Sequence, residues 1–106
     1  MPDQVREISD KENFDFQAYA IDAQPEQTRP KRLVRIGAIQ NQIVLPTTEP
    51  VAKQRDAIHQ RISKLIHAAS LCNVNILCLQ EAWHMPFAFC TREKQPWCEF
   101  AENGRK

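Results

Sequence analysis

The sequence predicts an α/β fold built around one βαβ unit and preceded by an N-terminal extension. Two short apolar runs, at residues 33–39 and 74–79, stand on either side of a helical pattern over residues 50–72. This order favours two parallel strands joined by a right-handed helical crossover. We therefore divide the chain into an extension at residues 1–30 and the N-terminal, incomplete part of an α/β domain at residues 31–106.

The extension is polar and shows no sustained hydrophobic period. Phe14, Phe16 and Tyr19 form a small aromatic group that could bury little surface alone. Two interpretations stay open: an arm that docks on a larger body, such as a neighbouring subunit, or a partly disordered arm.

The first strand is expected in KRLVRIGAIQ, directly after Pro30. Its apolar residues alternate onto both faces, with Val34, Ile36 and Ala38 on one and Leu33, Gly37 and Ile39 on the other. Apolar residues on both faces predict a strand that is buried on both sides. Gly37 indicates a close approach of the backbone to a neighbour.

The helix is predicted from about Pro50 to Cys72, because proline is tolerated in a first helical turn. Apolar residues recur at helical spacing along it: Ile58, Ile62, Leu65, Ile66, Ala69 and Cys72. Asn73 is expected to end it in the left-handed conformation. His59 and His67 are interpreted as surface or boundary residues and not as ligands.

The second strand is expected in VNILCL, at residues 74–79. Two strands and one helix leave one face of the sheet and both of its edges uncovered. More chain, or a partner, would have to supply the remaining cover.

Bulk composition excludes several function classes. The net charge of +1 gives no electrostatic case for nucleic acid or for an anionic membrane surface. No apolar stretch approaches the ~20 residues of a membrane span, and the N-terminus lacks the apolar segment of a secretory signal. The expectation is a soluble, cytoplasmic protein.

The cysteines are expected to be reduced and mainly structural, since Cys72, Cys78, Cys90 and Cys98 include no C-x-x-C pair. A metal site made from these four and His84 is the minor alternative.

A carboxylate follows the second strand, in NILCLQEAWHMPFAFCTREK. Functional groups of parallel sheets collect beyond the carboxyl ends of strands, and Glu81 stands there. A semi-buried Glu loses hydration, which makes it a stronger proton acceptor; the alternative is a Glu that caps the next turn. Trp83, Phe87 and Phe89 are expected to wall a dry pocket around it, or simply to fill the core.

These motifs together resemble the N-terminal part of the carbon–nitrogen hydrolase (nitrilase) superfamily, and most of all its members that hydrolyse ureido acids. LVRIGAIQN, the helix and QEAW-MPFAFCTREK carry the resemblance, which covers about residues 14–102. It implies a partial α-β-β-α sandwich, a small ureido-acid substrate, assembly as a homo-oligomer, and neither an organic cofactor nor a metal.

The resemblance also implies catalysis by a Glu, a Lys and a Cys, with Glu81 as the general base. The family's Lys and Cys follow later strands, so Cys90 and Lys94, which share one loop, are not expected to fill those roles. The chain is therefore expected to be a fragment without activity of its own. The alternative is a non-catalytic fragment that binds full-length subunits.

Overall fold

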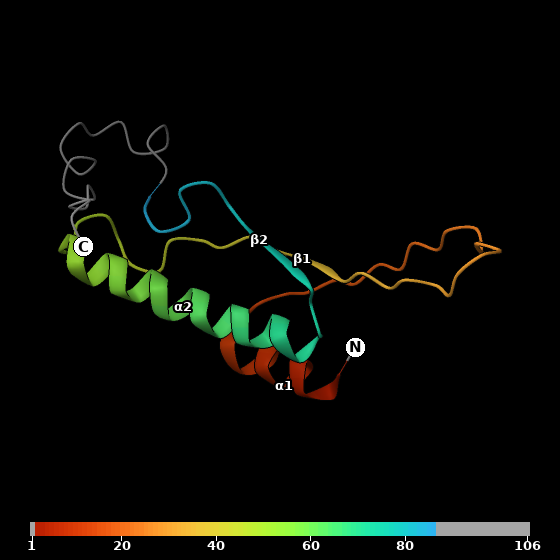
Figure 1. Cartoon of the computed structure of the whole chain (residues 1–106). Coiled ribbons are helices and arrows are strands. Elements are labelled where there is room, and N and C mark those ends of the chain that lie inside the picture. The colour runs from red at the N-terminus through yellow and green to blue at the C-terminus, as the bar shows by residue number, and fades with distance from the viewer. Residues whose placement is uncertain (1, 87–106) are drawn as a thin grey trace. The chain divides into compact units, whose positions relative to one another are not determined.

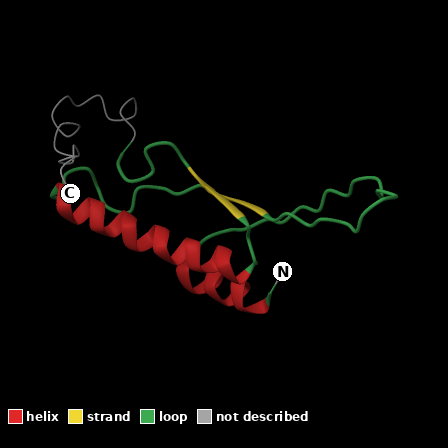
Figure 2. Ribbon diagram, in the orientation of Figure 1, coloured by secondary structure: helices red, strands yellow, loops and turns green. Residues whose placement is uncertain are grey.

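The chain forms two helices and two strands in the part that the computed structural model describes, residues 2–86 (Figure 1). Their order is α1 (Asp3–Glu12), β1 (Ile36–Ile39), α2 (Val51–Leu71) and β2 (Ile76–Leu79). Figure 2 shows β1 and β2 side by side, and they form one two-stranded sheet. The predicted βαβ unit is confirmed, and this mixture of helix and strand fits the predicted α/β class.

The two strands run parallel, as their hydrogen bonds show. Before β1, the carbonyl oxygen of Arg35 accepts from the backbone N–H of Asn75 (2.8 Å) and of Ile76 (3.2 Å). The Asn75 side-chain oxygen in turn accepts from the N–H of Arg35 at 2.9 Å. Beyond the strands, the N–H of Asn41 donates to Oε1 of Gln80 at 3.2 Å. Residue numbers rise together along both strands, so their carboxyl ends meet at one edge of the sheet.

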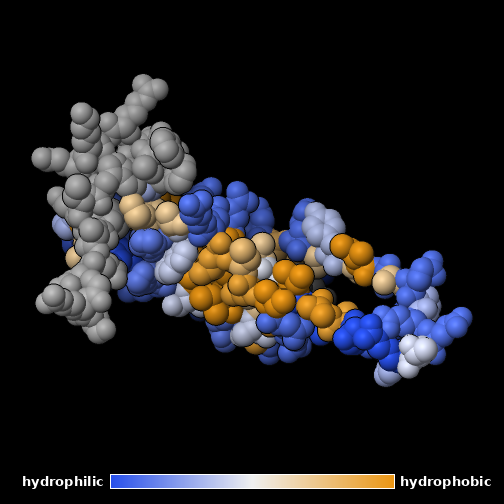
Figure 3. Space-filling model, turned by 45° about the horizontal axis from the view of Figure 1, so that its top comes forward, coloured by the Kyte–Doolittle hydropathy of each residue, from blue (hydrophilic) through white to orange (hydrophobic). Residues whose placement is uncertain are grey.

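One face of this sheet is half-buried and the other is exposed, because burial alternates along both strands. On the open face, Ile36 is 71% exposed and Ile76 is 56% exposed. Figure 3 shows apolar side chains gathered on the surface there. The prediction of strands buried on both sides is wrong for the described chain. The prediction that one helix leaves a sheet face uncovered is confirmed.

Gly37 lies where β1 and β2 approach closely, as its place in the sequence predicts. A Cβ at this position would stand 3.0 Å from Cδ1 of Leu77 and 3.2 Å from Cγ1 of Val74. Both neighbours belong to β2 or to the turn that leads into it. The missing side chain therefore lets apolar groups of the second strand pack directly on the backbone of the first.

Helix α2 matches its predicted limits within one residue at each end. Asn73 follows it with φ 55°, the left-handed stop that the sequence predicts. The N–H groups of Cys72 and Val74 both donate to the carbonyl of Ala69, which closes the last turn. His59 and His67 are exposed, as expected. No helix in residues 2–86 is both long and apolar enough to cross a membrane.

The chain divides into two compact units. The first consists of Met1–Ala38 with Ile66–Cys78, and the second of Ile39–Leu65 with the chain from Leu79 onward. Both contain buried residues: Val5, Ser9 and Ala68 in the first, and Gln54, Ile58 and Ile62 in the second.

In the second unit, a buried glutamine fixes the entry to α2. Nε2 of Gln54 donates to the carbonyl oxygens of Thr47 (3.3 Å) and Glu49 (2.6 Å). These two carbonyls belong to the loop that precedes the helix. A buried side-chain amide that makes two such bonds is well satisfied, so it ties the loop to the first helical turn.

In the first unit, the N-terminal extension contains a helix that the sequence pattern does not predict. Helix α1 lies beside the C-terminal part of α2 (Figures 1 and 2) and buries Val5 and Ser9. It ends at Asn13, which has φ 52° and donates its N–H to the carbonyl of Ser9. The Ser9 hydroxyl donates to the carbonyl of Phe14.

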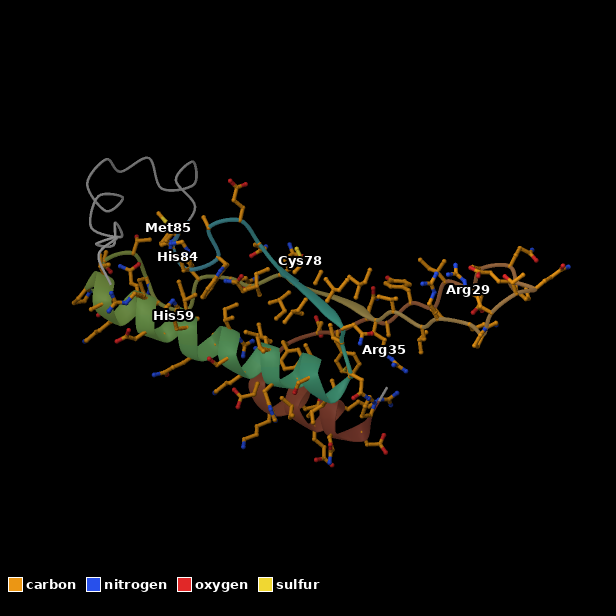
Figure 4. All side chains as sticks on the ribbon, in the orientation of Figure 1. Arg29, Arg35, His59, Cys78, His84 and Met85 are labelled. Atoms are coloured by element: carbon orange, nitrogen blue, oxygen red, sulfur yellow. The ribbon has the colours of Figure 1, made fainter. Side chains whose placement is uncertain are left out.

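Residues 14–35 form neither helix nor strand and are largely exposed. Tyr19 is 83% and Ile21 96% exposed. Arg29, labelled in Figure 4, donates two hydrogen bonds to Glu26, which hold the pKa of that carboxyl below its ordinary value. Both side chains of the pair are exposed to water, so it adds little to stability.

Gly37→Ala should destabilise the protein by about 1–2 kcal/mol, because the new methyl group would overpack Val74 and Leu77. Chemical denaturation measures this cost. Ala38→Ser, at the exposed neighbouring position, is the matched control and should change stability by less than about 0.5 kcal/mol. Adding Val74→Ala should restore part of the loss, and equal stability of Gly37→Ala and wild type would contradict the packing argument.

Candidate active site

The candidate site is the turn that follows β2. This turn, Glu81–Met85, is called the carboxylate turn below. The N–H of Met85 donates to the carbonyl of Ala82 at 3.2 Å, and Ala82 has φ 51°. A left-handed conformation is uncommon for a residue other than glycine, and such residues often occur at functional sites. The turn places Glu81 at the carboxyl edge of the parallel sheet, as the sequence predicts.

Glu81 is exposed in the described chain. The semi-buried setting expected from the sequence is therefore not what the structure shows. Gln80, the residue before it, is exposed as well. The residues that follow, Ala82 to Met85, are half-buried, and Pro86 is buried. A dry environment for the carboxylate would need cover from groups beyond residues 2–86.

Asn41 connects the end of β1 to both sides of Glu81. Its backbone N–H donates to Oε1 of Gln80 at 3.2 Å, and its side-chain Nδ2 donates to the carbonyl of Trp83 at 3.2 Å. Sequence reasoning missed Asn41. One signal could have found it: Asn41 is the second residue after β1, just as Glu81 is the second residue after β2.

Trp83, predicted as a pocket wall, is half-buried and packs against histidines. Its ring centroid lies 5.1 Å from that of His59 on α2, with 37° between the planes. The ring of His84 meets it edge-on at 5.8 Å and 75°. Figure 4 shows His59 on the helix below His84 and Met85 of the turn. Trp83 thus holds the carboxylate turn to α2, a role that the sequence did not indicate.

Several predicted residues lie outside the described residues: the pocket-wall candidates Phe87 and Phe89, and also Cys90, Lys94 and Cys98. Within the described part, Cys72 is half-buried and Cys78 is exposed. No three His, Cys, Asp or Glu side chains gather into a possible metal site anywhere in residues 2–86.

The sequence of this chain is similar to that of a plant hydrolase over almost its whole length. It is 53% identical to the β-ureidopropionase of Arabidopsis thaliana across 102 residues, which make up 96% of the chain. Over these residues, the chain resembles a segment of that β-ureidopropionase. It spans about a quarter of the length of that curated relative, 25%. No protein-family model matches the chain.

This match confirms the resemblance to carbon–nitrogen hydrolases that the sequence motifs carry. In this chain, the parallel strand pair, the carboxylate turn and the Asn41 contacts form one connected arrangement. It can present a single carboxylate at a fixed place on the sheet edge. One carboxylate can accept or return a proton, but it carries no positive charge with which to stabilise an oxyanion.

Ala82→Val should destabilise the folded protein by about 1–2 kcal/mol, because a β-branched side chain is poorly tolerated at positive φ. Ala82→Gly should be neutral or slightly stabilising, since glycine adopts this conformation without steric cost. Denaturant midpoints of the two variants measure the difference. Ala18→Val, at an exposed position without positive φ, controls for the added methyl groups. Equal midpoints for the Val and Gly variants would contradict the assigned turn geometry.

Proposed function

We propose that this chain is the segment of a β-ureidopropionase that supplies the general base, Glu81. The complete enzyme would hydrolyse N-carbamoyl-β-alanine to β-alanine, carbon dioxide and ammonia, a step of pyrimidine degradation. One observation carries the proposal: a carboxylate stands at the carboxyl edge of a parallel strand pair, in a sequence 53% identical to a β-ureidopropionase.

In the proposed mechanism, Glu81 takes the proton of a cysteine thiol as its sulfur attacks the carbamoyl carbon. A lysine cation stabilises the oxyanion that forms at that carbon. The carbon–nitrogen bond then breaks, and the amine leaves with the proton that Glu81 returns. Water activated by Glu81 finally cleaves the carbon–sulfur bond, which frees the thiol and releases carbamic acid, and this acid decomposes to carbon dioxide and ammonia. The cysteine and lysine would come from later strands of the complete enzyme, and no organic cofactor takes part.

The exposure of Glu81 bears on this mechanism. A general base works best in a site from which bulk water is excluded, because its electrostatic interactions with the reacting groups are stronger there. Trp83, Phe87 and Phe89 are the proposed walls of that site. The proposal also includes assembly as a cytoplasmic homo-oligomer, with the extension at residues 1–30 as a contact between subunits.

Two alternatives use the same site or the same surface. Another N-carbamoyl amidohydrolase or an aliphatic amidase would employ Glu81 identically, and a panel of ureido acids and amides separates these activities. A non-catalytic fragment that binds full-length subunits is favoured by a different observation, the apolar face on which Ile36 and Ile76 are exposed.

Glu81→Gln in the full-length enzyme should lower kcat by about 100-fold or more, because the amide cannot accept the thiol proton. Ammonia release from N-carbamoyl-β-alanine measures this loss. Asp56→Asn makes the corresponding change on the exposed side of α2 and should leave the rate within about twofold of wild type. A Glu81→Gln enzyme that keeps wild-type activity would refute the assignment of the base.

The purified 106-residue chain should release no ammonia from N-carbamoyl-β-alanine above the blank, since it would carry one of three catalytic groups. The same assay run with its Glu81→Gln variant is the control. Release that disappears in that variant would show that the chain is active alone. Co-purification with the full-length enzyme would instead support the interaction fragment.

A further inference from the structure

We propose that Asn41 is a positioning residue for the general base. This inference rests on the proposed function of Glu81. Both residues stand two positions beyond the ends of adjacent parallel strands. Side chains at such equivalent positions meet at one edge of the sheet, where functional groups of α/β proteins collect. Asn41 would act through the carboxylate turn and not by touching the substrate.

The two hydrogen bonds of Asn41 enclose Glu81 along the chain. One reaches Oε1 of Gln80, the residue before Glu81, and the other reaches the carbonyl of Trp83, two residues after it. A short segment anchored on both sides to one residue just beyond the neighbouring strand loses most of its backbone freedom. The position of Glu81 relative to the sheet edge is then set by Asn41.

The side-chain amide of Asn41 can make its bond in one orientation only. Nδ2 is the donor to the Trp83 carbonyl, and the reversed amide would place Oδ1 against that carbonyl as a second acceptor. In the observed orientation, Oδ1 is buried and has no hydrogen-bond partner within the described chain. A buried acceptor without a partner costs free energy, so packing alone would favour an apolar residue of similar size.

This cost separates a positioning role from a structural one. An apolar substitute such as leucine removes the unpaired acceptor but leaves the Trp83 carbonyl without this donor, so the two effects offset and stability should stay close to that of wild type. Loss of the donor to Trp83 should also loosen the carboxylate turn. A residue whose role is only structural would instead lose stability and activity together.

A second contact holds the same turn independently of Asn41. The ring of Trp83 lies against His59 of α2, whereas Asn41 binds the Trp83 backbone. Loss of the Asn41 side chain should therefore not detach the turn. The expected change is a displacement of the base, and a displacement of about 1 Å can lower a rate by about 100-fold.

Asn41→Leu and Asn41→Asp in the full-length enzyme test the proposal. Both variants should lower kcat by about 10- to 100-fold and keep KM within about twofold, since base placement matters in the transition state. Asn41→Leu should keep its Tm within about 2 °C of wild type. Asn41→Asp retains the shape of the side chain, replaces the Nδ2 donor with an acceptor and, when ionised, adds a negative charge beside the Trp83 carbonyl. Gln42→Leu, at the exposed next residue, is the matched control and should change none of these quantities.

Hydrogen–deuterium exchange supplies a readout that does not depend on activity. The peptide that covers residues 80–86 should exchange about 10-fold faster in both Asn41 variants, because the turn opens more often. The Gln42→Leu peptide should exchange at the wild-type rate. Unchanged exchange together with a kcat within about twofold of wild type would overturn the inference.

The remaining outcomes are also decisive. If Asn41→Leu does not fold, Asn41→Asp alone decides by the same measurements. Parallel losses of Tm and kcat in both variants would make Asn41 a structural residue and overturn the inference. A Glu81→Gln enzyme with wild-type activity refutes the proposed function itself, whereas an inactive Glu81→Gln enzyme beside fully active Asn41 variants refutes only the role of Asn41.

Discussion

The parallel register of β1 and β2 is the constraint on which the rest of the described structure depends. Before the strands, Asn75 fixes this register: its backbone N–H donates to the Arg35 carbonyl, and its side-chain oxygen accepts from the Arg35 N–H. Asn41 and Gln80 set it beyond them. A slip of one residue would turn the half-buried face of a strand to solvent and would also separate Asn41 from the carboxylate turn. The same pairing thus fixes both the packing of the sheet and the place of Glu81.

Local pattern was sufficient to predict the βαβ unit. The period of α2 is long and regular, and Pro50 and Asn73 mark its limits, so its ends were predicted to within a residue. Gly37 could be assigned to a close approach of a neighbouring group to the backbone, because a single glycine inside a strand often marks such an approach. Helix α1 could not be predicted in this way. Its residues are mainly charged, and only Val5 and Ser9 are buried, so tertiary contacts of the first unit decide its formation.

The candidate site was predictable in position but not in detail. Glu81 follows directly from the end of a strand, which the sequence marks clearly. The exposure of Glu81 could not be predicted from the sequence, because burial depends on groups far from this residue in the chain. Asn41 was missed for the same reason: its partner Trp83 is 42 residues away in sequence. The contact between His59 and Trp83 likewise joins a helix to a turn, and no local period encodes it.

Two departures from the expected burial have one physical cause. Ile36 and Ile76 present an apolar face to solvent, and Glu81 stands uncovered at the edge of the same sheet. Apolar side chains on a strand gain stability only when another layer removes them from water. The α-β-β-α sandwich that the sequence resemblance implies would place a second sheet against this face. Both the apolar face and Glu81 lack cover from the described residues, so neither reaches the burial that the sequence led us to expect.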